Sequence, residues 1–320
     1  MHKLAFIAVA GLGAAAVCIG AAAAIGGKDF HEGFDDFSLF DSKPRCEVIA
    51  GANATSRTMD WDGSDHVGVA VLGQASYTPG SGDKMTVSGS DPQVLAHLRI
   101  RDGYIEMDCR GWRNRTRDVA ITLPGREFRK FQTAGGGRLI LDQLNQSSAK
   151  IEISGAGSVK ANGRVDDLNT EIEGSGDADF GQVTTRKARF AIEGAGDIKA
   201  KGTADDLKVH IAGSGHVDFD EMTSRTGSVD IEGSGTVRAK GKIDELEITI
   251  AGSGKADFGQ VESRTAKVEI AGHGDVDMAP TDLAKVEIGG SGDVYLHSNP
   301  KSLDTDIGGS GRIHRLGSNT

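Results

Sequence analysis

The chain has 320 residues, of which 46 are glycine and only 6 are proline, and its formal net charge is −10. Glycine at about twice its usual share, without abundant proline, excludes collagen. The acidic balance disfavours nucleic acid as a partner. Val, Ile and Leu recur throughout, which argues for a folded protein that needs many tight turns.

The N-terminal segment 1–26 has the pattern of an export signal. His2 and Lys3 precede a charge-free stretch, 4–25, which includes four consecutive alanines at 21–24. A basic start, an apolar core and small residues at the end are typical of a secretory signal peptide. The stretch would also be long enough to remain as a single membrane anchor. The sequence therefore predicts an exported protein of the bacterial periplasm or cell surface, either cleaved or anchored through residues 4–25.

A linker, 27–44, leads from this segment to an N-terminal β region, 45–130, that contains two cysteines. Cys46 and Cys109 are the only cysteines outside the export signal. An even pair in an exported protein predicts one disulfide, and the alternative is two buried free thiols. The bond would contribute about 4 kcal/mol in the chain-entropy model, because it closes a long loop.

Arginine residues gather around aromatic residues late in the same region. The set that we consider for ligand binding is Arg101, Arg110, Trp112, Arg113 and Arg115. Guanidinium groups beside aromatic rings bind phosphate and carboxylate groups. The expected partners are therefore anionic cell-surface glycans or lipid headgroups, with envelope proteins as a further possibility. The alternative is a solvated loop without a ligand.

Residues 131–313 form a repeat, with a Gly-x-Gly pair every 18 to 20 residues. Gly135 to Gly137 open the series, and the pairs begin at Gly155, Gly174, Gly194, Gly213, Gly233, Gly252, Gly272, Gly290 and Gly309. Isoleucine stands two residues before every pair, within period-2 alternation that is typical of strands. The period predicts an all-β fold: a right-handed parallel β-helix of about ten 19–20-residue coils, followed by a tail, 314–320. Region 45–130 would be its cap of irregular β-hairpins.

Three further columns support this stacking, one that alternates in size and two that alternate in charge. Six residues after each first glycine, small and large side chains alternate: Ala161, Phe180, Ala200, Phe219, Ala239 and Phe258. A continuous column of phenylalanines would overfill the interior, so the alternation is a packing rule. Charges alternate in sign at two outward positions, one of which runs Lys160, Asp179, Lys199, Asp218, Arg238 and Asp257. Opposite charges on adjacent strands would stabilise the stack and set its register.

The alternation of charge breaks near the end of the repeat. Five residues form a candidate cation site there: Asp257, His273, Asp275, Asp277 and Asp293. Carboxylates with an imidazole can hold a divalent ion. The alternative is a set of solvated surface acids, and we predict no cofactor.

The repeated Ile-x-Gly-Ser-Gly-Asp-Val pattern resembles the autotransporter-adhesin head family known as the GIN domain. Segments 66–70, 84–89, 102–107 and 119–124 resemble its opening strands, its hairpin and the strand that leads into the coils. The resemblance covers about residues 65–312. It implies an exported β-helical protein of bacteria with a proposed adhesive role, and it brings no catalytic residues.

Three functions are compatible with these patterns. The first is a non-enzymatic binding, adhesive or structural protein of the cell envelope, which the long regular faces favour. The second is a polysaccharide lyase or hydrolase, against which the constant coil length argues because no coil carries a long loop. The third is an assembly scaffold, in which the open end of the β-helix would mediate oligomerisation.

Overall fold

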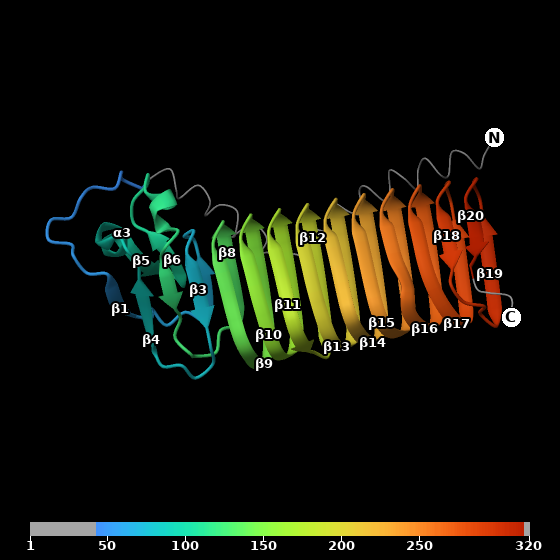
Figure 1. The fold of residues 1–320 in the computed structure, drawn as a ribbon, viewed down its shortest axis with the longest axis horizontal. Helices are drawn as coiled ribbons and strands as arrows, with labels where there is room; N and C mark the ends of the chain where they lie inside the picture. The colour runs from blue at the N-terminus through green and yellow to red at the C-terminus, as the bar shows by residue number, and fades with distance from the viewer. Residues whose placement is uncertain (1–42, 317–320) are drawn as a thin grey trace. The chain divides into compact units, whose positions relative to one another are not determined.

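The computed structural model describes residues 43–316, which form two compact units: residues 43–47 with 108–111, and residues 48–107 with 112–316. The predicted export signal 1–26, most of the linker 27–44 and the last four residues of the tail lie outside the described residues. No helix within 43–316 combines the length and the apolar character needed to cross a membrane. Strands dominate the larger unit (Figure 1).

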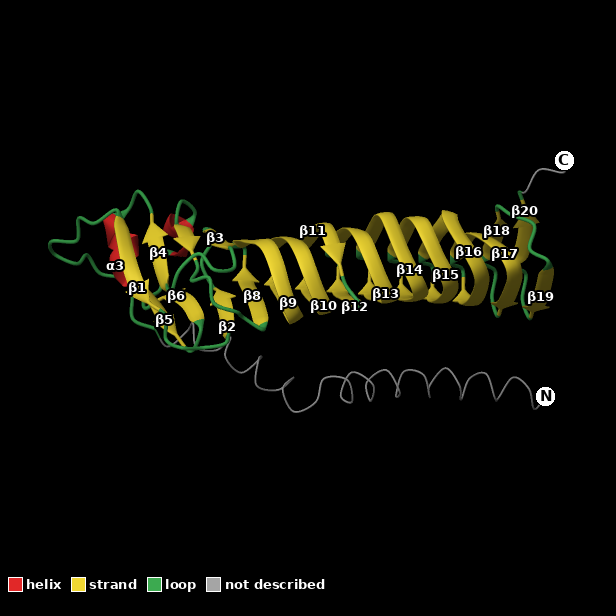
Figure 2. Ribbon diagram, turned by 90° about the horizontal axis from the view of Figure 1, so that it is seen from below, coloured by secondary structure: helices red, strands yellow, loops and turns green. Residues whose placement is uncertain are grey.

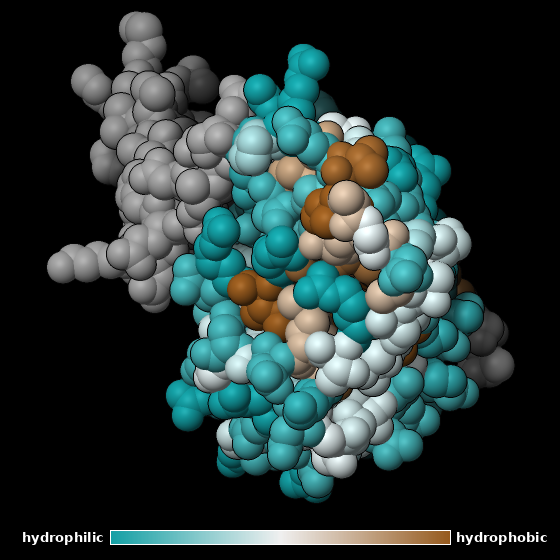
Figure 3. Space-filling model, turned by 90° about the vertical axis from the view of Figure 1, so that its left-hand side faces the viewer, coloured by the Kyte–Doolittle hydropathy of each residue, from teal (hydrophilic) through white to brown (hydrophobic). Residues whose placement is uncertain are grey.

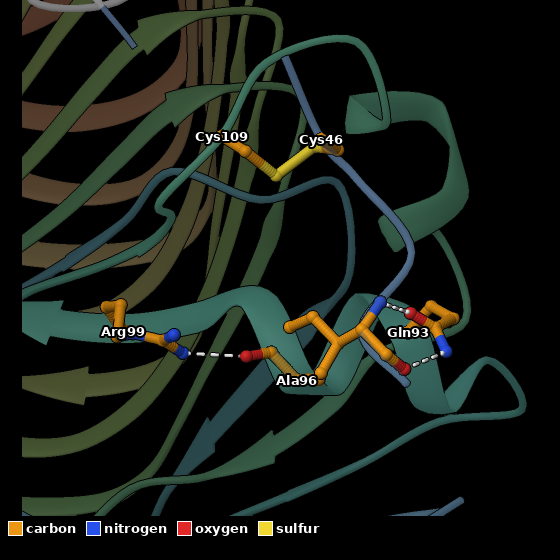
Figure 4. Close-up of a disulfide and its surroundings, with 6 residues drawn as sticks. Cys46, Gln93, Ala96, Arg99 and Cys109 are labelled. Carbon is orange, nitrogen blue, oxygen red and sulfur yellow. Dashed lines mark hydrogen bonds between the residues drawn. A yellow bond between two sulfur atoms is a disulfide. The ribbon is translucent and has the colours of Figure 1, made fainter. Parts of the chain in front are cut away.

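The smaller unit is built around a disulfide. Cys46 and Cys109 are bonded across 63 residues of sequence, with their Cα atoms 4.8 Å apart (Figure 4). The backbone holds the same two segments together, because Cys46 N donates to Arg110 O at 3.0 Å and Arg110 N donates to Pro44 O at 2.8 Å. The predicted pair therefore lies where two chain segments already run side by side.

The N-terminal part of the larger unit contains short strands and the two helices of the described chain. The strands are β1 (Ser56–Asp60), β2 (His66–Val69), β3 (Gln74–Tyr77), β4 (Lys84–Ser88), β5 (Leu98–Arg101), β6 (Tyr104–Met107) and β7 (Ala120–Thr122), and the helices are α3 (Pro92–His97) and the 3-10 helix η2 (Arg113–Thr116). Asp102 and Gly103 have φ of 48° and 73°. They form the two-residue turn that joins β5 to β6 as an antiparallel hairpin.

These strands extend the β-helix and then close it. β2 lies parallel to β6 on one side and to the first strand of the repeat on the other, and β3 pairs in the same way with β7. Beyond these layers, β4 pairs antiparallel with both β7 and β1. The parallel stack therefore ends in antiparallel strands, which cover edges that would otherwise be open. This region acts as a cap that is continuous with the coils.

The repeat forms about nine turns of parallel β-solenoid, close to the number predicted (Figure 2). Its strands are β8 (Lys130–Gly135), β9 (Arg138–Gly155), β10 (Ser158–Gly174), β11 (Asp177–Thr184), β12 (Lys187–Gly194), β13 (Asp197–Gly213), β14 (His216–Gly233), β15 (Thr236–Gly252), β16 (Lys255–Gly272), β17 (Asp275–Ile288), β18 (Asp293–Leu296), β19 (Ser302–Ile307) and β20 (Arg312–Arg315). Each pairs in parallel with the strand about one repeat away, which confirms the predicted fold class.

The core of the solenoid consists of columns of like residues. The isoleucines before successive corners stack in register, as Ile211 does on Ile231 and Ile231 on Ile250. All three are 0% exposed. β-branched side chains on adjacent strands pack well on a pleated surface, so the column joins one coil to the next.

The alternating column of phenylalanine and alanine is confirmed. Phe180 stacks opposite Ala200, and Ala200 stacks opposite Phe219. The ring of Phe190, which comes from the neighbouring column, lies 5.4 Å from Phe180 and 5.7 Å from Phe219 between ring centroids. The ring of Phe190 therefore fills space beside Ala200, between the two phenylalanines of the alternating column, as the dense packing of a protein interior requires.

Glycine is required at the corners because the backbone turns there at positive φ and stacked corners touch. Gly233 has a φ of +112°, and a Cβ on it would lie 2.6 Å from the carbonyl oxygen of Gly213, one coil earlier. The corner backbones hydrogen-bond between coils, since Ser234 N donates to Gly213 O at 2.9 Å. Each corner is thus a backbone contact that leaves no room for a side chain.

The C-terminal end of the described solenoid is an open edge. β19 pairs only with β17, and β20 only with β18. Ile307 is 41% exposed there. Arg315 stacks on Leu296, in the column that holds apolar residues in the other coils. A charge at an inward position discourages edge-to-edge pairing. Arg315 therefore weighs against the end-to-end assembly that the sequence suggested, and this assembly stays a prediction.

Candidate functional site

A column of alternating charges runs along the strands that follow the Gly-x-Gly corners, and we call this surface the ladder face. The register places Asp179 beside Lys199, Lys199 beside Asp218 and Asp218 beside Arg238, which confirms the predicted alternation. At the start of the column, the Lys160 ammonium lies 3.6 Å from the Asp179 carboxylate. The pairs are exposed, so each contributes less than about 1 kcal/mol to stability. Their regular spacing is the more important property.

Two open depressions lie side by side on the ladder face. One, of about 260 Å³, is lined by polar residues of three coils: Asp197, Lys199, His216, Asp218, Thr236 and Arg238. The other, of about 430 Å³, is lined by Phe180, Gly181 and Ala200 together with three lysines and three aspartates: Asp179, Lys199, Lys201, Asp218, Asp220 and Lys240. Because they share Lys199 and Asp218, we treat them as one surface feature, the ladder trough. It offers donors and acceptors in equal number, at one strand spacing.

In the predicted acidic cluster, side chains of the chain itself lie beside the closely spaced carboxylates. Asp257 does lie opposite Asp277 on the adjacent strand, the like-charge step expected from the sequence. However, Lys255 Nζ lies 3.4 Å from the Asp277 carboxylate and His297 Nε2 lies 2.8 Å from it. The Lys255 ammonium and the His297 imidazole thus give Asp277 two partners from the chain itself.

The other members of that cluster are also engaged. Asp293 N donates to the Asp275 carboxylate at 3.1 Å, Arg312 N donates to the Asp293 carboxylate at 3.0 Å, and His273 Nδ1 is hydrogen-bonded to Ser291 Oγ. Within residues 43–316, the groups of three possible ligands whose atoms lie within 4.8 Å of one another do not include this set. The five residues are therefore neighbours without being a shared coordination sphere.

Part of the predicted arginine cluster forms a packed network around Trp112. The Arg115 guanidinium carbon lies 4.0 Å from the centre of the Trp112 ring, and Arg115 Nε donates to the Asp91 carboxylate at 2.8 Å. Asp91 in turn caps the N-terminus of α3. The Arg113 guanidinium packs against Gly135, the first corner of the repeat. Arg115 thus packs within the cap and Arg113 joins the cap to the coils, so packing already uses part of their binding capacity.

The remaining two arginines of the predicted set lie apart from that network. Arg101 lies at the end of β5, where its guanidinium is 3.6 Å from the Glu106 carboxylate on β6. Arg110 belongs to the smaller unit, in which its backbone pairs with the segment around Cys46. The five residues predicted as a ligand site are thus distributed over several roles.

Sequence reasoning missed a compact donor set on the strands that precede the corners. His210 Nδ1 lies 3.5 Å from the Asp230 carboxylate. His210, Asp230 and Glu232 each offer one possible ligand atom, and these three atoms lie within 4.8 Å of one another. The signal was present in the sequence, because His210 and Asp230 both stand three residues before a corner glycine and therefore share a column. An imidazole and carboxylates are donors that zinc accepts.

Several further acids lie near this set. Partial burial raises the pKa of Glu173, and the neighbouring charges of Glu171 and Glu193 raise it further. The pKa of His210 is raised by its hydrogen bond to Asp230 and by the charges of Glu232 and Glu193. When it is protonated, the His210 imidazole is thus a counter-charge for these acids.

Replacing Asp230 by asparagine is expected to lower the pKa of His210. Because the folded-state pKa lies above that of the unfolded chain, the pair stabilises the fold below the unfolded pKa of about 6.5, and this stability is lost as the pH rises through the folded value. The variant should therefore lose stability in mildly acidic but not in alkaline buffer. NMR titration of His210 measures the shift, and Asp197→Asn, beside His216, is the matched control. An unchanged His210 titration in D230N would contradict the assignment.

Comparison with known proteins identifies one family. The profile described as “Putative auto-transporter adhesin, head GIN domain” matches residues 119–203 and 192–300, which together are more than half of the chain. No curated protein matches the sequence.

Several solved structures are similar at low sequence identity. A putative lipid binding protein from Parabacteroides distasonis is 18% identical over 84% of this chain and 100% of its own, with a TM-score of 0.43. A putative adhesin from Parabacteroides merdae is 13% identical over 84% and 98%, with a TM-score of 0.45. A putative adhesin from Bacteroides fragilis is 15% identical over 85% and 99%, with a TM-score of 0.37.

Proposed function

Because the chain belongs to the “Putative auto-transporter adhesin, head GIN domain” family, we propose that it is an exported cell-envelope protein that binds a polymeric surface ligand without transforming it. Family membership supports the envelope location and the adhesive role. The ligand that we propose is a cell-surface glycan, and its site is the ladder trough.

The observation that carries this proposal is the balanced, periodic chemistry of the trough. Lys199, Lys201 and Lys240 supply donors, while Asp179, Asp218 and Asp220 supply acceptors over adjacent coils. Sugar hydroxyls both donate and accept hydrogen bonds, so such a surface satisfies them without a deep pocket. A polymer lying along the solenoid would meet a lysine–aspartate pair again every second coil, which adds avidity to weak single contacts.

The triple variant K199A/K201A/K240A is expected to reduce glycan binding by at least about tenfold, since it removes three charged hydrogen-bond donors. Binding of the full chain is measured on a glycan array and on whole bacterial cells. All three side chains are exposed, so the variant should keep the fold, which circular dichroism verifies.

The matched control is K187A/K208A/K285A, three exposed lysines on the strands that precede the corners. It removes the same charge and should bind as the wild type does. An equal loss of glycan binding in both variants would show that binding depends only on net charge and not on the ladder trough. No loss of binding in either variant would show that the trough is not the glycan site. Cleavage of an acidic polysaccharide that D257N/D277N abolishes would overturn the non-enzymatic assignment.

A further inference from the structure

An uncharged, exposed loop leads into β1 at the cap end of the larger unit. Residues 48–55 contain no acid or base. Val48 and Ile49, at its start, are 75% and 37% exposed, and most of the remaining loop residues are exposed as well. Figure 1 shows the loop projecting beyond the strands of the cap, and Figure 3, which views that end, shows apolar atoms among a hydrophilic surface. Exposed aliphatic side chains at a projecting tip are typical of interaction sites.

The loop is held in position by specific hydrogen bonds. The side-chain amide of Gln93 pairs with the backbone of Ile49 in both directions: Ile49 N donates to Gln93 Oε1 at 2.8 Å, and Gln93 Nε2 donates to Ile49 O at 3.0 Å (Figure 4). A turn closes the tip, where Ala52 N donates to Ile49 O at 3.2 Å and Gly51 has a φ of +80°. The aliphatic pair is thus presented from a fixed point on α3.

Arginines surround the same short helix. Arg57 Nη1 donates to the carbonyl oxygen of Leu95, and Arg99 Nη1 donates to that of Ala96 at 2.8 Å (Figure 4). Guanidinium groups are common partners of the last carbonyls of a helix. Arg57 and Arg99 therefore place positive charge at the C-terminal end of α3, which carries the loop, whereas the charge of Arg115 at the other end is balanced by Asp91.

The charge of the chain is unevenly distributed along its length. Residues 43–130 carry 13 lysines and arginines against 11 acids, a net charge of +2, whereas residues 131–320 carry 21 against 30, a net charge of −9. An anionic surface would therefore attract the cap and repel the coils. The charge-free stretch 4–25 also precedes the cap in the sequence, so a membrane-inserted N-terminus would raise the effective concentration of residues 48–55 at the bilayer.

We propose that residues 48–55 dock on an anionic membrane surface. Val48 and Ile49 enter the headgroup layer, and the arginines around α3 are attracted to lipid phosphates. Apolar burial and electrostatic attraction to anionic lipids are the two contributions that hold peripheral segments on a bilayer. The solenoid would then extend from the membrane with its ladder face accessible. The proposal is independent of the glycan ligand.

Amide hydrogen exchange of the full chain tests the docking directly. With vesicles of phosphatidylcholine and phosphatidylglycerol, exchange in residues 48–55 should slow by about tenfold or more, because each basic residue near an anionic surface adds about 1 kcal/mol of attraction. Vesicles of phosphatidylcholine alone should slow it less, and raised salt should reduce the difference. Exchange at residues 92–97 of α3, which holds the loop through Gln93, should slow as well. The variant V48S/I49S should lose this slowing while it keeps the fold, because both replaced side chains are exposed.

The matched control is L283S/I307S, which removes two aliphatic side chains of similar exposure from the solenoid, 39% and 41% exposed. This control should keep the slow exchange that anionic vesicles cause, and K199A/K201A/K240A should keep it too. Failure of docking is therefore distinguishable from failure of glycan binding. Three results would overturn the proposal: no slowing with anionic vesicles, equal slowing with both lipids, or equal slowing by soluble dextran sulfate, which would indicate a glycan site. Unchanged behaviour of V48S/I49S would also overturn it.

Discussion

Replacing Gly233 by alanine is expected to destabilise the solenoid by about 2–5 kcal/mol. A residue with a Cβ costs about 1–2 kcal/mol at positive φ, and Gly233 has a φ of +112°. The added carbon would also lie 2.6 Å from Gly213 O, so stacked backbones must separate, at the cost of about 1–3 kcal/mol seen for overpacking. Because each coil is stabilised through its neighbours, the damage should spread along the stack. Urea unfolding followed by circular dichroism gives the difference.

Gly181→Ala is the control for this prediction. Gly181 lies in β11 at an ordinary φ, and the atom nearest to a Cβ added there would be Ala161 O, at 4.0 Å. Alanine fits at this position and restricts the unfolded chain, so the change should be neutral or stabilise the fold by up to about 1 kcal/mol. Equal effects of G233A and G181A would show that glycine content, rather than corner geometry, determines stability.

Phe219→Ala is expected to cost about 3–5 kcal/mol, the usual cost of truncating a fully buried aromatic residue. Phe219 is 0% exposed and stacks between Ala200 and Ala239. Since both neighbours in the column are small, they cannot fill the cavity, which would adjoin the ring of Phe190. The midpoint and slope of urea unfolding measure the loss.

The size rule of this column can be tested from the opposite direction. Ala200→Phe would place rings at three successive positions, Phe180, 200 and Phe219, and should destabilise by about 1–3 kcal/mol through overpacking. Combining A200F with F219A should cost less than the sum of the two, because the second change makes room for the first. Strict additivity would contradict the interlocked column.

The repeat could be predicted almost residue by residue because its geometry is local and periodic. A residue at a given number of positions from one corner lies beside the residue at the same number of positions from the next, so the pairing of Ile211 with Ile231 and of Lys199 with Asp218 follows from counting. The same counting pairs His210 with Asp230, which we overlooked because neither residue belongs to an alternating column.

The cap could not be predicted in this way. β2 lies between β6 and β8, so spatial order departs from chain order, and no periodicity records that arrangement. The arginines of this region show the consequence. Sequence proximity suggested one ligand site, whereas Arg115 reaches back to Asp91 and Arg113 reaches forward to Gly135. The exposed loop 48–55 was missed because its exposure depends on Gln93, more than forty residues away.

The distance between spin labels at positions 160 and 257 tests the stacked ladder most directly. Both positions belong to one column, in which five strand spacings of about 4.8 Å separate them, about 24 Å in total. The labels are attached to K160C/D257C in a Cys18→Ser background. Pulsed electron paramagnetic resonance should then give a single narrow distance distribution at this value plus the length of the label arms. A broad distribution, or a mean distance well beyond this value, would contradict the in-register solenoid and the ladder trough built on it.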